Sequence, residues 1–329
     1  EKLSMLDPSP RLVLDPEMGL LSAGRAASDC AIANAIAEHT MDIVERTEAL
    51  GGYEPVGEHD LFLMEYWELE QAKLKGKGKP PVFAGEIALV TGSASGIGEA
   101  CVEAFRSRGA AVAGIDLESV EGALDYLPLV ADVTDPTAVE EAIALTVDSF
   151  GGLDMLVLNA GLFPPTQRLD EIDDESWSKT IAVNLDANQR LLRLCHPLLK
   201  LSPNGGRVIV VGSKNVPAPG PGAAAYSASK AAMTQLARVA ALEWANDDIR
   251  VNVLHPNSVF DTNLWANGIL EKRAEAYDMT VEQYKRRNLL KTEVFSSDVA
   301  EAAAEFCGPR FAKTTGAQLP VDGGEDRVV

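Results

Sequence analysis

The stretch Glu86-Ile-Ala-Leu-Val-Thr-Gly-Ser-Ala-Ser-Gly-Ile-Gly98 decides the fold of this chain. Its first five residues, 86–90, are mostly apolar and predict a buried strand, and a helix is expected to begin at Gly98. Gly92 and Gly96 permit a tight turn, and the N-terminus of a helix offers N–H donors to a phosphate group. A glycine-rich turn alone can be a simple corner. Here the flanking strand and helix supply the context that a dinucleotide-binding turn requires.

Apolar strands alternate with amphipathic helices from Ala84 onward, which predicts a parallel sheet covered on both faces. This is the α/β doubly wound, Rossmann-type arrangement. The expected strands are 86–90, 110–115, 153–158, 206–211 and 249–254, and the expected helices are 98–108, 137–150, 177–199 and 226–244.

Residues 1–80 differ in character and predict an N-terminal helical extension, followed by the dinucleotide-binding domain at 81–329. The extension is too short to bury a large core alone. We expect it to pack against the following domain, another subunit or a missing upstream part. Its expected elements are a strand at 11–14, a turn at 15–19, a helix capped by Ser28 and stopped by Gly51-Gly52, a helix at 60–75 and a linker at 73–81.

The composition argues against some partners. The 329 residues carry a net charge of −20, which disfavours a nucleic-acid backbone or an anionic membrane. No apolar run reaches the length of a membrane span, and no signal peptide opens the sequence. The four cysteines form no CxxC pair and are expected to be reduced thiols of a cytoplasmic protein. The first residue is Glu rather than Met, so we expect a piece of a longer polypeptide.

Asp116 ends the second expected strand, eighteen residues after Gly98. A carboxylate there can accept hydrogen bonds from both hydroxyls of an adenine ribose and would repel a 2′-phosphate, so we predict NAD rather than NADP. The alternative is a solvated strand-end carboxylate. Asp132 and Val133 fit the adenine edge, and Asp132 is equally suited to a turn.

Tyr226 and Lys230 are four residues apart and share one face of an expected helix. An ammonium near a phenol lowers the tyrosine pKa from about 10, which predicts an acid or base usable near neutral pH. Alone the pair is a weak signal, because Tyr and Lys meet at this spacing on many solvated helices.

The order and spacing of Gly92-x-x-x-Gly96-x-Gly98, Asn159-Ala160-Gly161, Asn184, Ser213 and Tyr226-x-x-x-Lys230 resemble the short-chain dehydrogenase/reductase family, over about Phe83 to Val329. The resemblance implies that Tyr226 exchanges a proton with the substrate oxygen, Lys230 binds the nicotinamide ribose, Ser213 polarises the carbonyl and Asn184 holds a relay water. It implies a cofactor set of Gly92, Ser95, Gly96, Ile97, Gly98, Asp116, Asp132, Val133, Asn159, Ala160, Gly161, Tyr226, Lys230, Pro256 and Val259.

One segment, Leu254 to Thr262, departs from that family. Asn257 stands where a glycine is usual, and Thr262 lies one residue further from Val259 than expected. Asparagine tolerates left-handed backbone angles, so we expect the turn to survive at Asn257. His255 is expected to be structural or ribose-facing rather than a second proton carrier.

A closer resemblance covers the whole chain. The segments Pro10–Leu14, Glu65–Leu74, His255–Asn257 and Leu290–Val294 resemble bifunctional aldolase/short-chain dehydrogenases linked to rhamnose breakdown, in which a zinc-dependent aldolase comes first. The resemblance implies L-lactaldehyde as substrate, residues 1–80 as the end of the aldolase half, and a homodimer or tetramer. With four scattered histidines we expect no metal site and no aldolase activity.

Three other readings stay open: a dehydrogenase of another sugar or polyol, a catalytically weak cofactor-binding scaffold, and an epimerase. The substrate pocket is expected to be lined by Leu162, Phe163 and a mobile lid from Phe260 to about Leu290.

Overall fold

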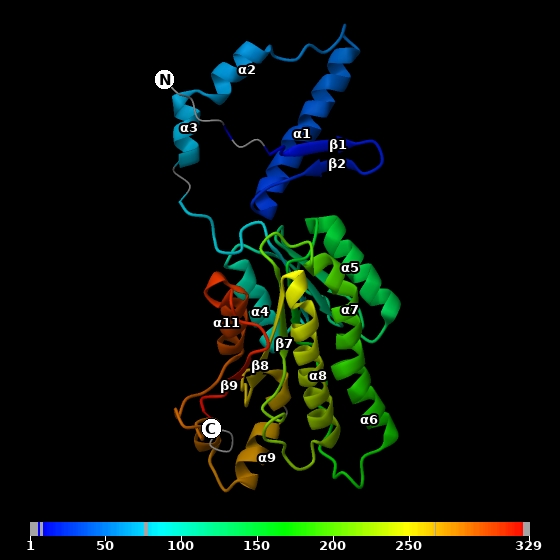
Figure 1. Cartoon of the computed structure of the whole chain (residues 1–329), viewed down its shortest axis with the longest axis vertical. Helices are drawn as coiled ribbons and strands as arrows, with labels where there is room; N and C mark the ends of the chain where they lie inside the picture. Colours follow the sequence, from blue (N-terminus) through cyan, green and yellow to red (C-terminus); the bar gives the residue numbers. More distant parts are fainter. Residues whose placement is uncertain (1–5, 7–8, 76–77, 267, 325–329) are drawn as a thin grey trace. The chain divides into compact units, whose positions relative to one another are not determined.

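The computed structural model describes residues 6, 9–75, 78–266 and 268–324. It divides into two compact units, Glu1–Gly85 and Glu86–Val329 (Figure 1). Part of the predicted linker, residues 76–77, lies outside the described residues.

The first unit consists of a hairpin and three helices among its described residues. Strands β1 (Leu12–Asp15) and β2 (Gly19–Ser22) pair antiparallel, and Asp15 Oδ1 accepts hydrogen bonds from the turn amides of Glu17 and Met18 at 2.8 Å. Only the first of these strands is predicted by the sequence. The helices are α1 (Ala27–Glu48), α2 (Glu58–Glu65) and α3 (Glu68–Lys75).

Two predictions for this unit are wrong. Ser28 does not cap α1, because the chain is already helical there; Ala26, with extended backbone, is the N-cap. The single helix expected at 60–75 is two helices, since the backbone leaves helical angles at Tyr66. The Gly51-Gly52 stop is correct, and both glycines adopt positive φ angles.

The second unit is built on a parallel sheet with seven strands among the described residues, in the order β5-β4-β3-β6-β7-β8-β9. The doubly wound prediction is confirmed. Strand order reverses between β3 and β6, and in open α/β sheets ligands bind at the carboxyl ends beside such a point. The strands are β3 (Ile87–Thr91), β4 (Ala111–Asp116), β5 (Tyr126–Val130), β6 (Met155–Leu158), β7 (Gly206–Val211), β8 (Ile249–Pro256) and β9 (Gln318–Val321).

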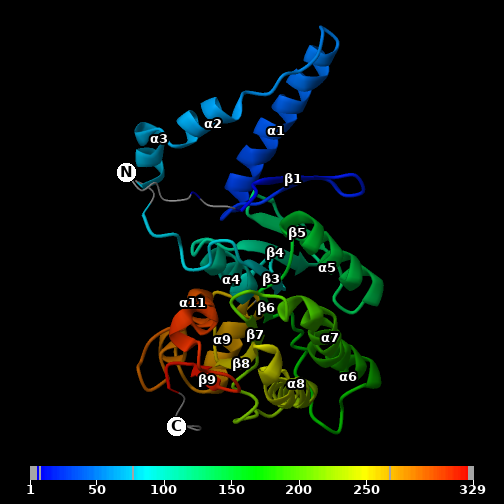
Figure 2. The same cartoon turned by 45° about the horizontal axis from the view of Figure 1, so that its top comes forward.

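Helices cover both faces of this sheet (Figure 2). One layer contains α4 (Gly96–Arg106) and α11 (Ser296–Cys307), and the other contains α5 (Pro136–Phe150), α7 (Ala187–Leu199) and α8 (Ala224–Glu243). Every residue of β6 and β7 is buried, as expected for central parallel strands. Pro128 lies within β5, which the position of this strand at the sheet edge permits.

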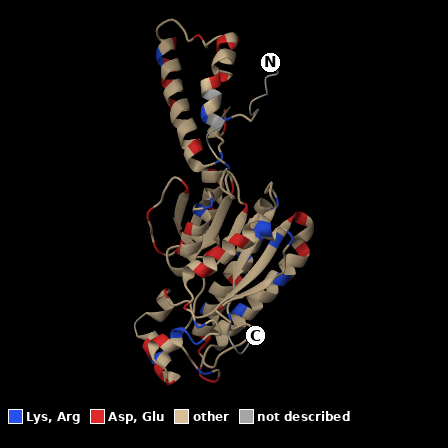
Figure 3. Ribbon diagram, turned by 90° about the vertical axis from the view of Figure 1, so that its left-hand side faces the viewer, with Lys and Arg blue, Asp and Glu red and all other residues tan. Residues whose placement is uncertain are grey.

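The helix expected at 177–199 contains an irregularity. It begins earlier, as α6 (Asp174–Ile181), and passes through a π-helical turn at Ala182–Asp186 before α7. Such turns occur frequently at functional sites. Acidic residues recur along the helices of both units, in keeping with the net charge (Figure 3).

Candidate active site

The glycine-rich turn joins β3 to α4 and leaves no room for side chains. Gly92 and Gly96 have φ of +67° and +55°, and a Cβ on Gly98 would lie 1.8 Å from the carbonyl oxygen of Gly92. Ser95 is the N-cap of α4 and makes no side-chain capping bond. The first turn of the helix, with Ile97, can therefore direct backbone N–H groups at a diphosphate.

Asn159 joins the carboxyl ends of β3 and β6. Its Nδ2 donates to the carbonyl oxygens of Thr91 at 2.9 Å and Gly92 at 3.1 Å. The backbone N–H groups of Asn159 and Ala160 both donate to Thr91 Oγ1 at 3.0 Å. This side chain fixes the turn above which a dinucleotide would lie. Thr91 was not singled out from the sequence, although its place directly before Gly92 is a usable signal.

Asp116 lies at the carboxyl end of β4, where it accepts hydrogen bonds from Ala94 N–H at 2.9 Å and Glu118 N–H at 3.1 Å. The carboxylate thus borders the glycine-rich turn, in the position that an adenosine ribose would require. A hollow of about 480 Å³ adjoins the glycine-rich turn, and its lining includes Ser93, Ala94 and Gly96.

Asp132 belongs to a turn. Its Oδ1 accepts from the N–H and hydroxyl of Thr134 at 2.8 and 2.7 Å, and these bonds lower the pKa of Asp132. Val133 is buried in the core beside it. Oδ2 of Asp132 accepts neither of these two bonds, so the adenine-edge role stays a prediction.

The structure brings Ser213, Tyr226 and Lys230 together. Ser213 follows β7, and its side chain is hydrogen-bonded to that of Tyr226 in the first turn of α8. Lys230 lies one turn further on, with its Nζ 5.9 Å from the Tyr226 ring centroid and 2.9 Å from the carbonyl oxygen of Val211. Tyr226 is half-buried, whereas Lys230 is buried.

The expected lowering of the Tyr226 pKa is wrong in this structure. Burial raises the pKa of Tyr226, and the bond from Ser213 opposes that rise only partly. Burial also lowers the pKa of Lys230 to about 8, and its ammonium is directed at a backbone carbonyl. Desolvation is the first cause of both pKa shifts.

Asn184 lies at the centre of the π-helical turn and is fully buried. Its Oδ1 accepts from Leu162 N–H at 2.7 Å, and its Nδ2 donates to the Leu162 carbonyl at 2.9 Å and to Ser229 Oγ at 3.0 Å. The side chain therefore ties the loop after β6 to α8. A Cβ on Gly161 would lie 3.3 Å from Lys230 Nζ and 3.4 Å from Asn184 Oδ1, so these polar atoms and the loop meet closely.

The departing segment turns at a different residue from the one predicted. Ser258, not Asn257, has the left-handed backbone, with φ of +51°. The altered turn places Val259 in a parallel bridge with Val294. Thr262 packs over the turn, since a Cβ on Gly96 would lie 3.1 Å from its methyl group. Pro256 ends β8 close by in the sequence.

Aromatic rings border the site. The Phe163 ring packs against Tyr226, with centroids 4.6 Å apart, as a wall beside the reactive phenol. Beyond it, Phe260, Trp265 and Tyr284 form a cluster with centroid distances of 5.0 to 6.2 Å. These rings lie on the segment that was predicted to be a lid.

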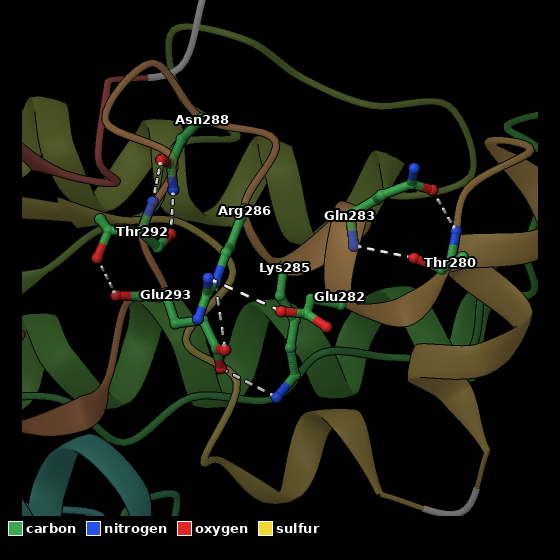
Figure 4. Close-up of polar contacts among 8 residues, drawn as sticks. All are labelled: Thr280, Glu282, Gln283, Lys285, Arg286, Asn288, Thr292 and Glu293. Atoms are coloured by element: carbon green, nitrogen blue, oxygen red, sulfur yellow. Dashed lines mark hydrogen bonds and ion pairs between the residues drawn. The ribbon is translucent and has the colours of Figure 1, made fainter.

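The lid segment has regular structure of its own, including α9 (Ile269–Ala276) and α10 (Val281–Lys285). Thr280 and Gln283 form a capping box at α10, and Glu293 accepts from Lys285 at 3.0 Å (Figure 4). Asn288 bonds both backbone groups of Thr292, at 2.8 and 3.1 Å. The mobility of this segment stays a prediction.

Three buried cysteines of the second unit are not poised to react. Burial raises the pKa of Cys101, Cys195 and Cys307 to about 12, so none of these three is poised as a nucleophile.

In the described part of the chain, no cluster of three or more His, Cys, Asp or Glu is arranged to hold a metal ion. No helix of that part is long and apolar enough to cross a membrane.

The described residues form a doubly wound sheet of seven strands whose switch point carries a glycine-rich turn, with a serine, a tyrosine and a lysine beside it, and this combination is typical of an oxidoreductase. The chain belongs to the short-chain dehydrogenase/reductase family. Residues 92–325 match the family model described as enoyl-(acyl carrier protein) reductase, and residues 1–74 match that of the second domain of class II aldolases.

Curated relatives and solved structures agree with this family assignment. The chain is 31% identical, over 97% of its length, to "uncharacterized oxidoreductase YuxG" of Bacillus subtilis, and it spans 49% of that protein. It is 36% identical to cis-4-hydroxycyclohexanecarboxylate dehydrogenase of Sinomonas cyclohexanicum, over 74% of this chain and 97% of that one. It also resembles 3-ketoacyl-(acyl-carrier-protein) reductase of Brucella melitensis complexed with NADH, with a TM-score of 0.65, 27% identity, and 74% and 99% of the chains covered.

Proposed function

We propose that this chain is an NAD-dependent dehydrogenase of a small hydroxyaldehyde or alcohol, with L-lactaldehyde as the first candidate. The observation that carries the chemistry is the hydrogen bond between Ser213 and Tyr226 with Lys230 one helical turn away. That arrangement provides an acid or base, a donor for the substrate oxygen and a nearby cation.

The cofactor proposal is specific to NAD. Asp116 places a carboxylate beside the glycine-rich turn, where it would accept from ribose hydroxyls and repel a 2′-phosphate. Related structures were solved with NADH and NAD bound. Gly92 to Gly98, Asp116, Asn159 and Lys230 would hold the cofactor. When bound, NAD supplies the acceptor for the hydride.

In the forward reaction, the Tyr226 phenolate takes a proton from the substrate hydroxyl while the adjacent C–H loses its hydride. Ser213 Oγ holds the substrate oxygen, and Lys230 stabilises the phenolate. An aldehyde reacts as its hydrate: one hydroxyl proton goes to Tyr226, and the product is the carboxylic acid. No cysteine nucleophile is required, in keeping with the raised pKa values of the buried thiols.

The substrate proposal depends on the N-terminal unit. Residues 1–74 match the second domain of class II aldolases, and the Bacillus subtilis relative is about twice as long as the match. These findings support a bifunctional aldolase/dehydrogenase, of which this chain carries the dehydrogenase half and the end of the aldolase half. A role in rhamnose breakdown, and with it lactaldehyde as substrate, stays a prediction. The absence of aldolase activity, a cytoplasmic location and a dimer or tetramer stay predictions.

The test measures NADH formation from its absorbance at 340 nm, with lactaldehyde and a panel of small polyols as substrates. We expect turnover of lactaldehyde by wild type and a loss of about 10²-fold or more in Tyr226→Phe, because the proton acceptor is removed. Turnover of a different polyol would favour the alternative sugar dehydrogenase. Binding of NADH without turnover of any substrate would favour the cofactor-binding scaffold.

A further inference from the structure

His255 joins three neighbouring strands directly behind the candidate active site. It lies in β8 and is 5% exposed. Its Nδ1 accepts a hydrogen bond from the backbone N–H of Ser213, after β7, at 3.2 Å. Its Nε2 lies 3.0 Å from Oε1 of Gln318, on the edge strand β9. Both ring nitrogens are therefore engaged within the protein.

These contacts define the tautomer of the imidazole. A backbone N–H can only donate, so Nδ1 must carry no proton where it meets Ser213. The ring proton then lies on Nε2, where it is donated to the amide oxygen of Gln318. His255 is thus a neutral bridge from the edge strand to the backbone of Ser213, and not an open proton carrier.

The space around the ring confines it. A Cβ on Gly212 would lie 2.7 Å from His255 Nδ1 and 2.9 Å from Cε1, closer than Cβ atoms approach other groups. The N–H of Gly212 donates to the Leu254 carbonyl at 2.8 Å, which fixes the strand end beside the ring. The imidazole fits only because residue 212 lacks a side chain.

The serine that His255 holds is also held on its side-chain oxygen. Ser213 Oγ accepts from Asn215 N–H at 3.1 Å and is bonded to the Tyr226 side chain. A shift of the Ser213 backbone would therefore move Oγ away from the phenol. A displacement of about 1 Å in a reacting group can cost about 10²-fold in rate.

We propose that His255 is a positioning residue for Ser213, with Gln318 fixing its tautomer. The inference rests on the proposed function, in which Ser213 holds the substrate oxygen. It assigns no proton transfer to His255.

Three variants of the full chain test the proposal in steady-state kinetics. His255→Leu removes the acceptor for Ser213 N–H, and Gly212→Ala forces the intact imidazole aside. We expect each to lower kcat by about 10- to 100-fold with little change in KM for NAD. His255→Asn places Oδ1 where Nδ1 stood, so it should recover kcat to within a few-fold of wild type. The matched control is His196→Asn, since His196 is bonded to Asp247 and not to the site.

The His255→Asn variant separates the possible roles, because asparagine accepts a hydrogen bond but cannot act as an acid or base. Recovery by His255→Asn supports positioning. An unchanged kcat in His255→Leu overturns the proposal, and so does an equal loss in Leu and Asn variants, which indicates proton transfer or a packing role. The thermal midpoint of each variant is measured alongside, so that loss of fold is not mistaken for loss of positioning.

A spectroscopic test of the His255 tautomer requires no turnover. In histidine-labelled protein, the ring ¹⁵N shifts should show His255 as the Nε2–H tautomer, and Gln318→Leu should alter that signal. A proton on Nδ1 overturns the proposal even if the enzyme is active. If wild type oxidises no substrate, the proposed function fails by itself, and the ring spectrum still decides whether the bridge exists.

Discussion

At the scale of single residues, Lys230 is a buried lysine of the site whose pKa is lowered by desolvation. Its ammonium is buried, bonded to one backbone carbonyl, and close to a phenol that is itself desolvated. The site is therefore poorly solvated for charge. We infer that a positively charged nicotinamide ring bound there would favour the Tyr226 phenolate, which burial disfavours.

The Lys230 pKa makes a prediction about stability. Burial lowers it to about 8, from 10.5 for an unperturbed lysine. Between these values the unfolded chain binds a proton at Lys230 that the folded chain does not. Raising the pH through this window should therefore stabilise wild type relative to Lys230→Met, by up to about 3 kcal/mol. Below pH 8 both states are protonated, and the difference should become constant.

Urea unfolding at pH 7.5 to 9.5 should show about 2 kcal/mol of this change, and the range stays below the tyrosine transition. Tyr226 has a raised pKa and acts in the opposite sense above about pH 10, but both proteins retain it. Parallel stability curves for the two proteins would contradict the assignment of a lowered lysine pKa.

Asp116 predicts cofactor choice. Replacement by serine removes the charge that would meet the ribose hydroxyls, so NAD should bind about 10- to 100-fold more weakly, the cost of a hydrogen bond to a charged group. NADP should bind better than it does to wild type. Fluorescence titration with NADH and NADPH gives both constants. Glu118→Gln is the control, because it removes a charge two residues away. If it weakens NAD binding equally, Asp116 acts through the local electrostatic potential and not through a direct hydrogen bond to the ribose.

At the scale of elements, the π-helical turn is the feature that builds the site. It lets Asn184 face the loop after β6 and the first turns of α8 at the same time, through Leu162 and Ser229. An unbroken helix would rotate this side chain relative to its partners. The extra residue of the π-helical turn therefore sets the direction of the Asn184 side-chain amide.

Asn184→Leu should therefore lower both stability and activity. It leaves the N–H and carbonyl of Leu162 without their side-chain partner, at a cost of about 2 kcal/mol in the free energy of unfolding. The loop carrying Phe163 would also lose its anchor, so kcat should fall. Asn188→Ala is the control: it removes one bond to the Asn184 carbonyl and should cost stability with less effect on kcat. An equal fall in kcat would indicate a general packing effect.

The sheet could be predicted because central parallel strands are continuous apolar runs and because the turn after β3 is rich in glycine. The position of Asp116 followed from the same pattern. The π-helical turn could not be predicted, since it is stabilised by tertiary bonds from Asn184. Neither could the left-handed Ser258 nor the link from His255 to Gln318, because each depends on which strands become neighbours.

At the scale of the whole molecule, the two units differ in how well they bury apolar side chains. In the second unit, Leu89, Leu156 and Val208 are fully buried in a continuous core. In the first, Ile32 and Ile36 of α1 are 60% and 61% exposed, and Ala37 is the buried residue of that helix. Exposed apolar faces of this kind mark surfaces that pack on a partner. This supports, without identifying the partner, the proposal that the first unit belongs to an aldolase half.

The division into units predicts that the dehydrogenase is separable. A shortened chain of residues 80–329 keeps the glycine-rich turn and the four residues proposed to be catalytic, Asn184, Ser213, Tyr226 and Lys230, and it loses the exposed apolar face of α1. We expect its kcat and its affinity for NADH to stay within about twofold of the full chain, because every contact described for the site lies within the second unit. We also expect less self-association, since exposed apolar surface drives it.

Kinetics, NADH titration and sedimentation of the two chains, compared at equal concentration, measure these quantities. The shortened Tyr226→Phe chain is the control for residual turnover. Loss of cooperative unfolding in the shortened chain would show that the second unit requires the first for its fold. A loss of kcat with intact unfolding and intact NADH affinity would instead show that the first unit contributes to catalysis, and the site would then extend beyond the residues assigned to it.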